Sequence, residues 1–177
     1  MESKIVKHIC LNNHPVAVLR ADSVPQKAIC FKEGKWGCVV ALIKVASQGK
    51  IAAAAKDTTV CMGGRAGLGF QGYEHGWIEY FLSTGNDKIP HSEFYKKTPE
   101  LAKIFTDTIP KIEAPACLVF KPLDLVEDDE KPECIIFLVN ADQLSFSIPY
   151  SRFLEMEQEA DGCFFTTDTW ETIKKRI

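Results

Sequence analysis

The most restrictive feature of this sequence is a glycine-dense segment near its middle. Five of the ten residues from 63 to 72 are glycine, and the segment begins at Cys61 and contains Arg65. Glycine loses more backbone freedom on folding than any other residue, so it disfavours the interior of helices and strands. The sequence therefore predicts a loop here, and successive backbone N–H groups of such a loop can surround an anion.

Two other interpretations of the glycines must be weighed. The run from Gly67 to Gly72 matches the G-x-G-x-x-G pattern of dinucleotide-binding loops. That fold needs a strand directly before the glycines and a helix directly after them, and the flanking residues do not predict this arrangement. We interpret the match as accidental. The glycines could also mark a close crossing of two backbones, and this alternative stays open.

A second cysteine, Cys38, precedes a predicted helix. Four apolar residues follow it at helical spacing: Val39, Leu42, Ile43 and Ala46. Gly49 then provides a stop signal, and Gly37 a start. A thiol in the first turn of a helix lies near the partial positive charge of the unpaired N–H groups, which favours the thiolate.

Cys38 and Cys61 are therefore the candidate metal ligands or nucleophiles. The candidate donors to a bound anion are the Arg65 guanidinium and the backbone of four glycines: Gly63, Gly64, Gly67 and Gly69. Each residue also has a simpler explanation, because free cysteines are commonly buried fillers and arginines are commonly solvent-exposed. The catalytic residues, if there are any, cannot be assigned from these patterns.

The remaining patterns predict a single α+β domain over residues 1–177. Strands are predicted at 15–19, 28–31, 51–55, 116–120 and 134–139. Helices are predicted at 77–84, 98–109 and 149–156, with a last short one from Thr169. In the helix begun by Thr98-Pro99, the predicted buried face is Leu101, Ile104 and Phe105. Because strands and helices do not alternate regularly, we expect a mixed or antiparallel sheet with helices packed on it.

The charge balance and the cysteine content predict which partners the protein has and where in the cell it lies. The chain of 177 residues has 21 basic and 24 acidic side chains, which argues against a protein that neutralises nucleic-acid phosphates. No run approaches the roughly 18 apolar residues of a membrane helix, and the start lacks a signal-peptide core.

Seven cysteines, an odd number, predict reduced thiols and a cytoplasmic protein. Three of them lie in apolar runs and are predicted to be buried: Cys30, Cys117 and Cys134. The acidic run 127–130 is interpreted as a solvated turn.

Six ordered runs resemble the family catalogued as domain of unknown function 169 (DUF169), also labelled ArCR. They cover residues 34–39, 61–70, 81–85, 95–100, 119–123 and 139–144, and residues 148–157 resemble the family's C-terminal motif. The resemblance implies no established activity. The resemblance implies a further glycine-rich segment with a cysteine, which family members usually carry before that last motif. Here Leu144 is followed directly by Ser145, so either this protein has lost the segment or the sequence omits it. If the family's site uses three cysteines, this chain has only the Cys38 and Cys61 parts.

These observations lead to three hypotheses from different classes. The first is a protein that binds a small molecule or a metal at Cys38 and Cys61, with an iron–sulfur cluster or another thiolate-bound metal and a redox role. The second is a non-enzymatic module that binds a small anionic metabolite through the glycine segment and Arg65. The third is a structural or oligomerising module without a site, in which Cys38 and Cys61 lie far apart. The sequence does not indicate the oligomeric state or whether the protein is an enzyme.

Overall fold

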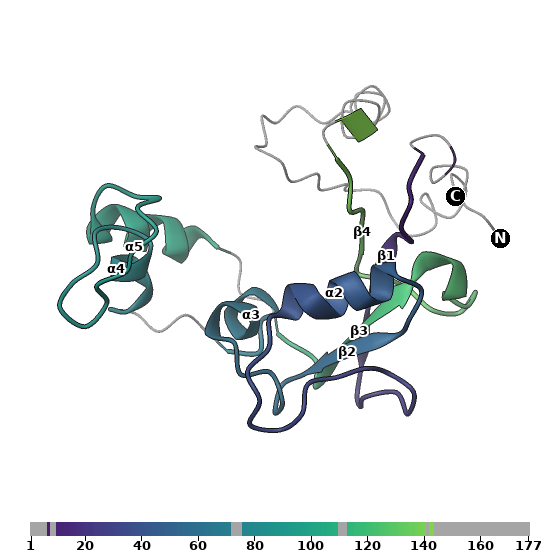
Figure 1. The fold of residues 1–177 in the computed structure, drawn as a ribbon. Coiled ribbons are helices and arrows are strands. Elements are labelled where there is room, and N and C mark those ends of the chain that lie inside the picture. The colour runs from purple at the N-terminus through teal and green to yellow at the C-terminus, as the bar shows by residue number, and fades with distance from the viewer. Residues whose placement is uncertain (1–6, 8–9, 72–75, 110–112, 141, 144–177) are drawn as a thin grey trace.

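The computed structural model describes residue 7 and residues 10–71, 76–109, 113–140 and 142–143 (Figure 1). Within them, four strands form one sheet whose neighbouring strands are all antiparallel. The strand order is β2-β3-β1-β4, for β1 (Val16–Ala21), β2 (Ala52–Ala55), β3 (Cys117–Pro122) and β4 (Cys134–Ile136). The helices are α2 (Val39–Ser47), α3 (Met62–Gly67), α4 (Ile78–Phe81), α5 (Pro99–Thr108) and the 3-10 turn η1 (Leu123–Leu125). The α+β class predicted from the sequence is confirmed.

The central strands of the sheet are β1 and β3. Leu19 of β1 lies opposite Val119 of β3, and β3 is buried along its whole length. Strands predicted near 15–19, 51–55, 116–120 and 134–139 are present, the last one shorter than expected. The strand predicted at 28–31 is wrong. Only Ile29 reaches β2, through an isolated parallel bridge to Ala52, so the segment adds a single contact to that sheet edge.

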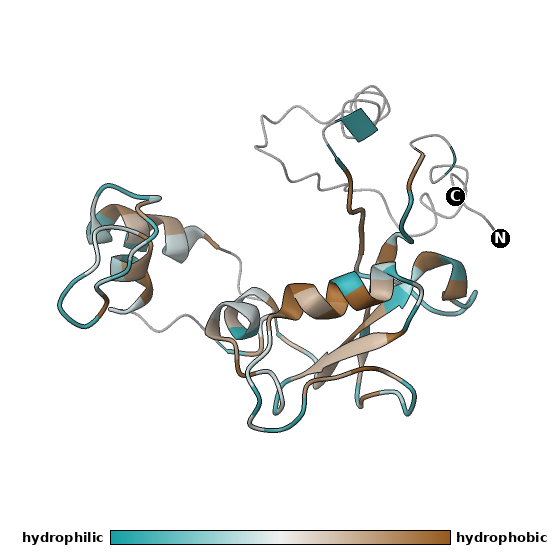
Figure 2. Cartoon of the chain, in the orientation of Figure 1, coloured by the Kyte–Doolittle hydropathy of each residue, from teal (hydrophilic) through white to brown (hydrophobic). Residues whose placement is uncertain are grey.

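Helix α2 covers one face of the sheet and forms the main core with it. Buried residues of α2 (Val39, Leu42 and Ala46) belong to the same cluster as Val18 and Phe120 from the strands. Figure 2 shows α2 and the strands beneath it mostly in the colours of apolar residues. Strand β2 consists of four buried alanines, although alanine has a weak preference for strands. Its burial beside β3 and beneath α2 accounts for the strand where intrinsic propensity does not.

The opposite face of the sheet holds a smaller cluster that contains Cys117. Cys117 packs with Leu19, Ala53 and Val119, and it is 1% exposed. This burial, with smaller effects from the nearby Cys30 and Asp57, raises the pKa of the Cys117 thiol to about 11. The prediction that Cys117 is buried is confirmed. The same prediction is wrong for two other thiols, since Cys30 lies just past the single bridge of Ile29 and Cys134 lies on the edge strand β4, and both are exposed.

Cys117 is expected to resist alkylation in the folded chain at pH 8, while the exposed Cys30 and Cys38 react. The thiolate is the nucleophile, and burial both hides this thiol and keeps it protonated. Peptide mass spectrometry after brief labelling with iodoacetamide, with and without denaturant, measures the difference. Labelling of native Cys117 as fast as that of Cys30 would contradict the burial.

The raised pKa of Cys117 also has a consequence for stability. The unfolded chain gives up this thiol proton at lower pH than the folded chain does, so the stabilisation is complete below the ordinary cysteine pKa and is lost as the pH rises toward about 11. We therefore expect the free energy of unfolding to fall over this range. Urea titrations from pH 8 to 11 measure it, and the Cys117→Val chain, without this proton, should show a smaller fall.

Lys121 is a buried cation within β3 that is paired with the acidic turn after η1. Its Nζ atom lies 2.8 Å from Glu130 Oε2 and 3.8 Å from Glu127 Oε1, and its side chain is 10% exposed. Glu130 Oε2 also accepts a hydrogen bond from the backbone N–H of Glu127, at 2.7 Å. The acidic run was predicted to be a solvated turn, which is wrong for Glu130, because the carboxylate folds back to neutralise a lysine that the sheet buries.

Helices α4 and α5 pack on each other at one side of the sheet (Figure 1). The start of α5 is as predicted: Thr98 Oγ1 accepts a hydrogen bond from the N–H of Leu101, and Pro99 occupies the first helical position. Helix α4 is shorter than predicted, with the ring of Trp77 before it stacked on Phe81 at a centroid distance of 4.8 Å. These contacts make the pair a small helical unit.

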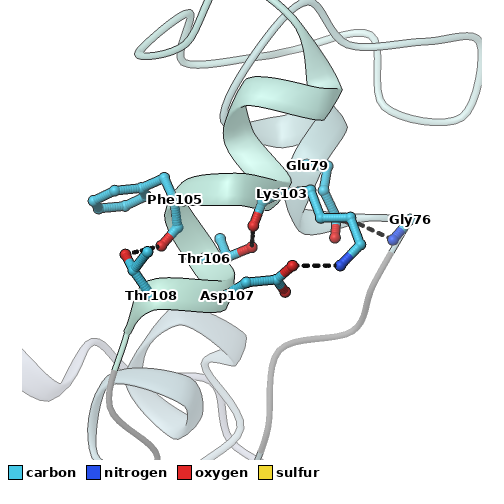
Figure 3. A network of polar contacts seen from close by, with 7 residues as sticks. All are labelled: Gly76, Glu79, Lys103, Phe105, Thr106, Asp107 and Thr108. Atoms are coloured by element: carbon cyan, nitrogen blue, oxygen red, sulfur yellow. Dashed lines mark hydrogen bonds and ion pairs between the residues drawn. The ribbon is translucent and has the colours of Figure 1, made fainter.

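The buried face predicted for α5 is wrong. Leu101, Ile104 and Phe105 are 47%, 63% and 46% exposed, whereas Ala102 and Thr106 are buried. Figure 3 shows the Phe105 ring on the opposite side of α5 from Lys103 and Asp107, which form an ion pair of 2.6 Å. The buried side of α5 therefore carries small side chains, which apolar periodicity alone does not reveal.

In the described part of the chain, no helix has the length and apolar character needed to cross a membrane. The helices predicted at 149–156 and from Thr169 lie outside the described residues. The position between Leu144 and Ser145, the glycine at position 72 and the seventh cysteine, Cys163, also lie outside the described residues.

Candidate functional site

Cys38 occupies the N-cap of α2, immediately before the first helical residue. Its φ and ψ of −81° and 129° are extended, and its carbonyl oxygen accepts a hydrogen bond from the N–H of Ala41, at 2.9 Å. No side chain caps this helix start, and Cys38 is exposed. The helix ends as predicted, since Gln48 is the C-cap and Gly49 follows with φ of +90°. The predicted position of Cys38 at the start of a helix is confirmed.

Cys61 occupies the N-cap of a second helix, α3, in the segment that was predicted to be a loop. That prediction is wrong for residues 62–67, which form α3; the N–H of Arg65 donates to the carbonyl of Cys61, at 2.8 Å. A Schellman motif ends the helix, with N–H groups of Gly69 and Phe70 bonded to the carbonyls of Ala66 and Arg65. Gly69 has φ of +75°, the left-handed conformation this motif requires, and Phe70 is buried in the main core. The end motif and the anchoring of Phe70 offset the low helix propensity of the glycines.

The Arg65 side chain binds the chain segment that leads into α3. Its Nη1 atom donates to the carbonyls of Lys56 and Thr59, both at 3.1 Å, and its Nε atom donates to Gln71 Oε1 at 2.8 Å. A guanidinium can bind a carboxylate or phosphate in two-point fashion only with donors that the protein leaves available. These bonds within the chain favour a structural role, in which Arg65 links the residues before α3 to Gln71 after it.

The fold brings the segments of Cys38 and Cys61 together, and Gly64 is the point of contact. A Cβ atom placed on Gly64 would lie 2.6 Å from Val39 Cγ2 and 3.6 Å from Cys61 Cβ. Val39 directly follows Cys38 and is buried in the first turn of α2. Figure 1 shows α3 beside the start of α2. Gly64 therefore lets α3 approach the Val39 side chain closely, whereas a Cβ atom at Gly63 or Gly67 would meet nothing within 4 Å. We refer to this contact between α3 and the first turn of α2 as the crossing.

Apolar side chains surround the two cysteines in the sequence and remain exposed. They are Trp36 and Val40 on either side of Cys38, and Val60 and Met62 on either side of Cys61. Sequence reasoning did not consider Met62, whose thioether sulfur is a further soft donor. The signal for Met62 was present in the sequence, directly after Cys61.

The described residues do not complete the ligand set of an iron–sulfur cluster at this place. Such a cluster normally has four protein ligands, and no group of three or more His, Cys, Asp and Glu side chains suited to a metal is found in the described ranges. His14 lies elsewhere, paired with Asp124 at 2.9 Å, and His75 lies outside the described residues. The candidate sulfur donors of these two segments are thus one thiol at each helix start and, next to Cys61 in the sequence, the thioether of Met62.

The comparisons with known proteins identify a family and no activity. The model of the family described as uncharacterised ArCR, DUF169, matches residues 4–145, which is most of the chain. Both cysteines of the candidate site and the whole glycine segment lie inside this match, whereas residues 148–157, which resemble the family's C-terminal motif, lie beyond it. No significant match was found among curated proteins or among solved structures.

Proposed function

The chain belongs to the DUF169 family of uncharacterised ArCR proteins, and we propose that this member binds a metal ion or small molecule through the thiols of Cys38 and Cys61. The observation that supports this proposal is the packing of Gly64 against Val39, which brings the helix that follows Cys61 against the residue that follows Cys38. Neither helix start is capped by a side chain, so each thiol lies next to backbone N–H groups that no side chain of the helix start satisfies.

Two chemical roles are open to a pair of thiols placed in this way. As thiolates, both sulfurs can bind one soft metal ion. As a dithiol, they can be oxidised to a disulfide, with two electrons and two protons passing to a disulfide or flavin acceptor. The redox role is the more specific of the two. It requires the two cysteines to lie close together, because a disulfide needs Cα atoms within about 7 Å.

Binding of an anion by Arg65 and the glycine amides has less support. The Nε and Nη1 donors of Arg65 are bonded to Lys56, Thr59 and Gln71, and the N–H groups of Arg65, Leu68 and Gly69 are bonded to carbonyls of the same segment. These bonded amides cannot also cradle a ligand, which leaves only the amides in the first turn of α3, such as those of Gly63 and Gly64, for an anion. The thiols are therefore the better-supported ligands.

The thiol site is tested by the metal content and absorption spectrum of the full chain purified without oxygen. We expect bound metal, or a bound chromophore, in the unaltered protein and in Cys30→Ser, and loss of it in Cys38→Ser and Cys61→Ser. Cys30 is the matched control because its thiol is also exposed but lies outside the crossing. Equal metal content in all four proteins, or none in any of them together with thiols that stay reduced after exposure to oxidised thioredoxin, would refute the proposal.

A further inference from the structure

We infer that the exposed apolar face of the helical unit of α4 and α5 binds a second copy of this chain, with the two α5 helices side by side and parallel. The face consists of three residues of α5 and two residues of the segment before it: Leu101, Ile104, Phe105, Phe94 and Tyr95. The inference concerns other residues than the proposed thiol site and does not depend on that proposal.

The first argument is the size of this face. Its five side chains belong to residues that are between 46% and 72% exposed. An aromatic side chain has about 200 Å² of surface and an aliphatic one somewhat less, so the five together expose roughly 500 Å². The largest apolar patch of a monomeric protein is about 300–600 Å² and often has a function, and weak complexes bury about 600 Å² on each partner. The face therefore has the size of a weak dimer interface.

The two aromatic residues before α5 belong to a segment that is fixed beside this helix. The backbone N–H of Lys96 donates to the carbonyl of Leu82, at the end of α4, at 2.9 Å. The Nζ atom of the same lysine lies 4.7 Å from the centre of the Phe105 ring. The segment therefore borders the exposed face at Phe105, on the side of α5 that packs against α4.

The second argument is the backbone conformation of Phe94. Its φ of +54° lies in the left-handed region, which costs free energy for a bulky side chain. Phe94 is nevertheless 71% exposed, so this conformation gains little burial within the chain. Strained residues of this kind gather at binding and switch sites. A second copy that covers the ring would supply the burial that one chain lacks.

The third argument is the charge on the two flanks of the face. Successive residues of a helix are rotated by about 100°, so Glu100 and Asp107 lie along the flank beside Ile104. Figure 3 shows Asp107 on the opposite side of α5 from Phe105. Lys96 lies at the Phe105 flank, where its ammonium contacts the ring. One flank of the exposed face is therefore acidic and the other is basic.

A second copy of this chain is the partner that these flanks favour. In a two-fold dimer with parallel helices, the acidic flank of each copy faces the basic flank of the other. Antiparallel helices would instead bring flanks of like charge together. Residues 93–107 contain three lysines and three acidic residues. This balance favours neither an anionic membrane surface nor a strongly charged partner, because both would need an excess of one sign.

The interface is tested by the mass of the full chain in solution, measured by sedimentation over a range of protein concentrations with a reductant present. We expect a reversible dimer with a dissociation constant of about 1–100 μM. Ile104→Glu should weaken it by about tenfold or more, because the new carboxylate would be buried against apolar side chains.

Val40→Glu is the matched control for this substitution. Val40 is also a β-branched residue of a helix and is 63% exposed, as Ile104 is, but it lies on α2 and outside the exposed face. The dimer should be unchanged in this variant. Circular dichroism spectra matching those of the unaltered chain confirm that each variant is folded.

Cross-linking tests the parallel orientation. Leu101 and Thr108 lie two turns apart on the same side of α5, about 10 Å along the axis. In a parallel pair each of them lies near its own copy, so Leu101→Cys and Thr108→Cys should both increase the amount of disulfide-linked dimer formed by mild oxidation. An antiparallel pair can bring at most one of the two positions to the two-fold axis.

Three outcomes would contradict the inference. A chain that stays monomeric at every concentration overturns the interface, and a lower free energy of unfolding in Ile104→Glu would then show that another part of the chain covers the face. A dimer that Ile104→Glu and Val40→Glu weaken equally overturns the location of the interface. Increased cross-linking in only one of the two cysteine variants overturns the parallel orientation.

Discussion

Replacing Gly64 with alanine is expected to lower the free energy of unfolding by about 2 kcal/mol. The new methyl group would lie 2.6 Å from Val39 Cγ2, closer than carbon atoms can approach. Val39 is buried and β-branched, so its side chain has few alternative rotamers, and the clash is relieved only if α3 moves away from α2. Urea unfolding followed by circular dichroism measures the change.

Gly63→Ala is the matched control for this substitution. It adds the same methyl group to the same helix at a position where no atom lies within 4 Å. Alanine favours helix over glycine by roughly 1 kcal/mol, so Gly63→Ala is expected to be neutral or stabilising. Equal effects of the two substitutions would show that the contact between Gly64 and Val39 does not hold α3 on α2.

The same pair of variants connects the fold with the site. If the crossing at Gly64 positions Cys61 beside Cys38, then Gly64→Ala should weaken metal binding while the chain is still folded, and Gly63→Ala should not. The measurement is the metal content of each chain purified without oxygen, made in the absence of denaturant. Unchanged binding in a folded Gly64→Ala chain would mean that the thiols act independently of this contact.

Replacing Glu130 with glutamine is expected to lower the free energy of unfolding by about 2 kcal/mol. The substitution leaves the buried ammonium of Lys121 without its 2.8 Å carboxylate partner, and only the more distant Glu127 remains nearby. The cost is smaller than for a fully buried ion pair because Glu130 is partly exposed to water. Thermal or urea unfolding of the full chain measures it.

Two further variants show whether the cost comes from the unpaired lysine. Glu127→Gln removes an exposed charge 3.8 Å from Lys121 and is expected to cost less than about 0.5 kcal/mol. Lys121→Met keeps the apolar part of the side chain, so the double variant Lys121→Met with Glu130→Gln should be more stable than Glu130→Gln alone. Additive losses in the double variant would contradict coupling between these two side chains.

Much of the sheet and its main helix could be predicted from the sequence because their patterns are local. The apolar runs of β1 and β3 and the helical spacing after Cys38 report burial directly. The Thr98-Pro99 start and the Gly49 stop are signals of backbone chemistry within one or two turns. Such features do not depend on which distant segment completes the core.

The errors share a different physical origin. The periodicity of α5 suggested a buried face of Leu101, Ile104 and Phe105, but the helix buries Ala102 and Thr106, because the neighbour decides which side is covered. The low helix propensity of glycine predicted a loop at α3. The Schellman motif at the end of this helix and the burial of Phe70 stabilise the helix despite that propensity. The acidic turn is exposed at residues 127–129 as predicted, but Glu130 pairs with Lys121, a lysine that the distant strand β3 buries.

The sequence by itself determined the α+β class, the position of Cys38 at the start of a helix, and the two cysteines worth testing. Only the tertiary structure decided that Gly64 meets Val39 and that Arg65 is bonded within its own segment. The reason is that helix starts and apolar runs are set by neighbours in the chain. Contacts between α3 and α2, and the partners of a guanidinium, depend on packing between segments that sequence spacing alone does not place.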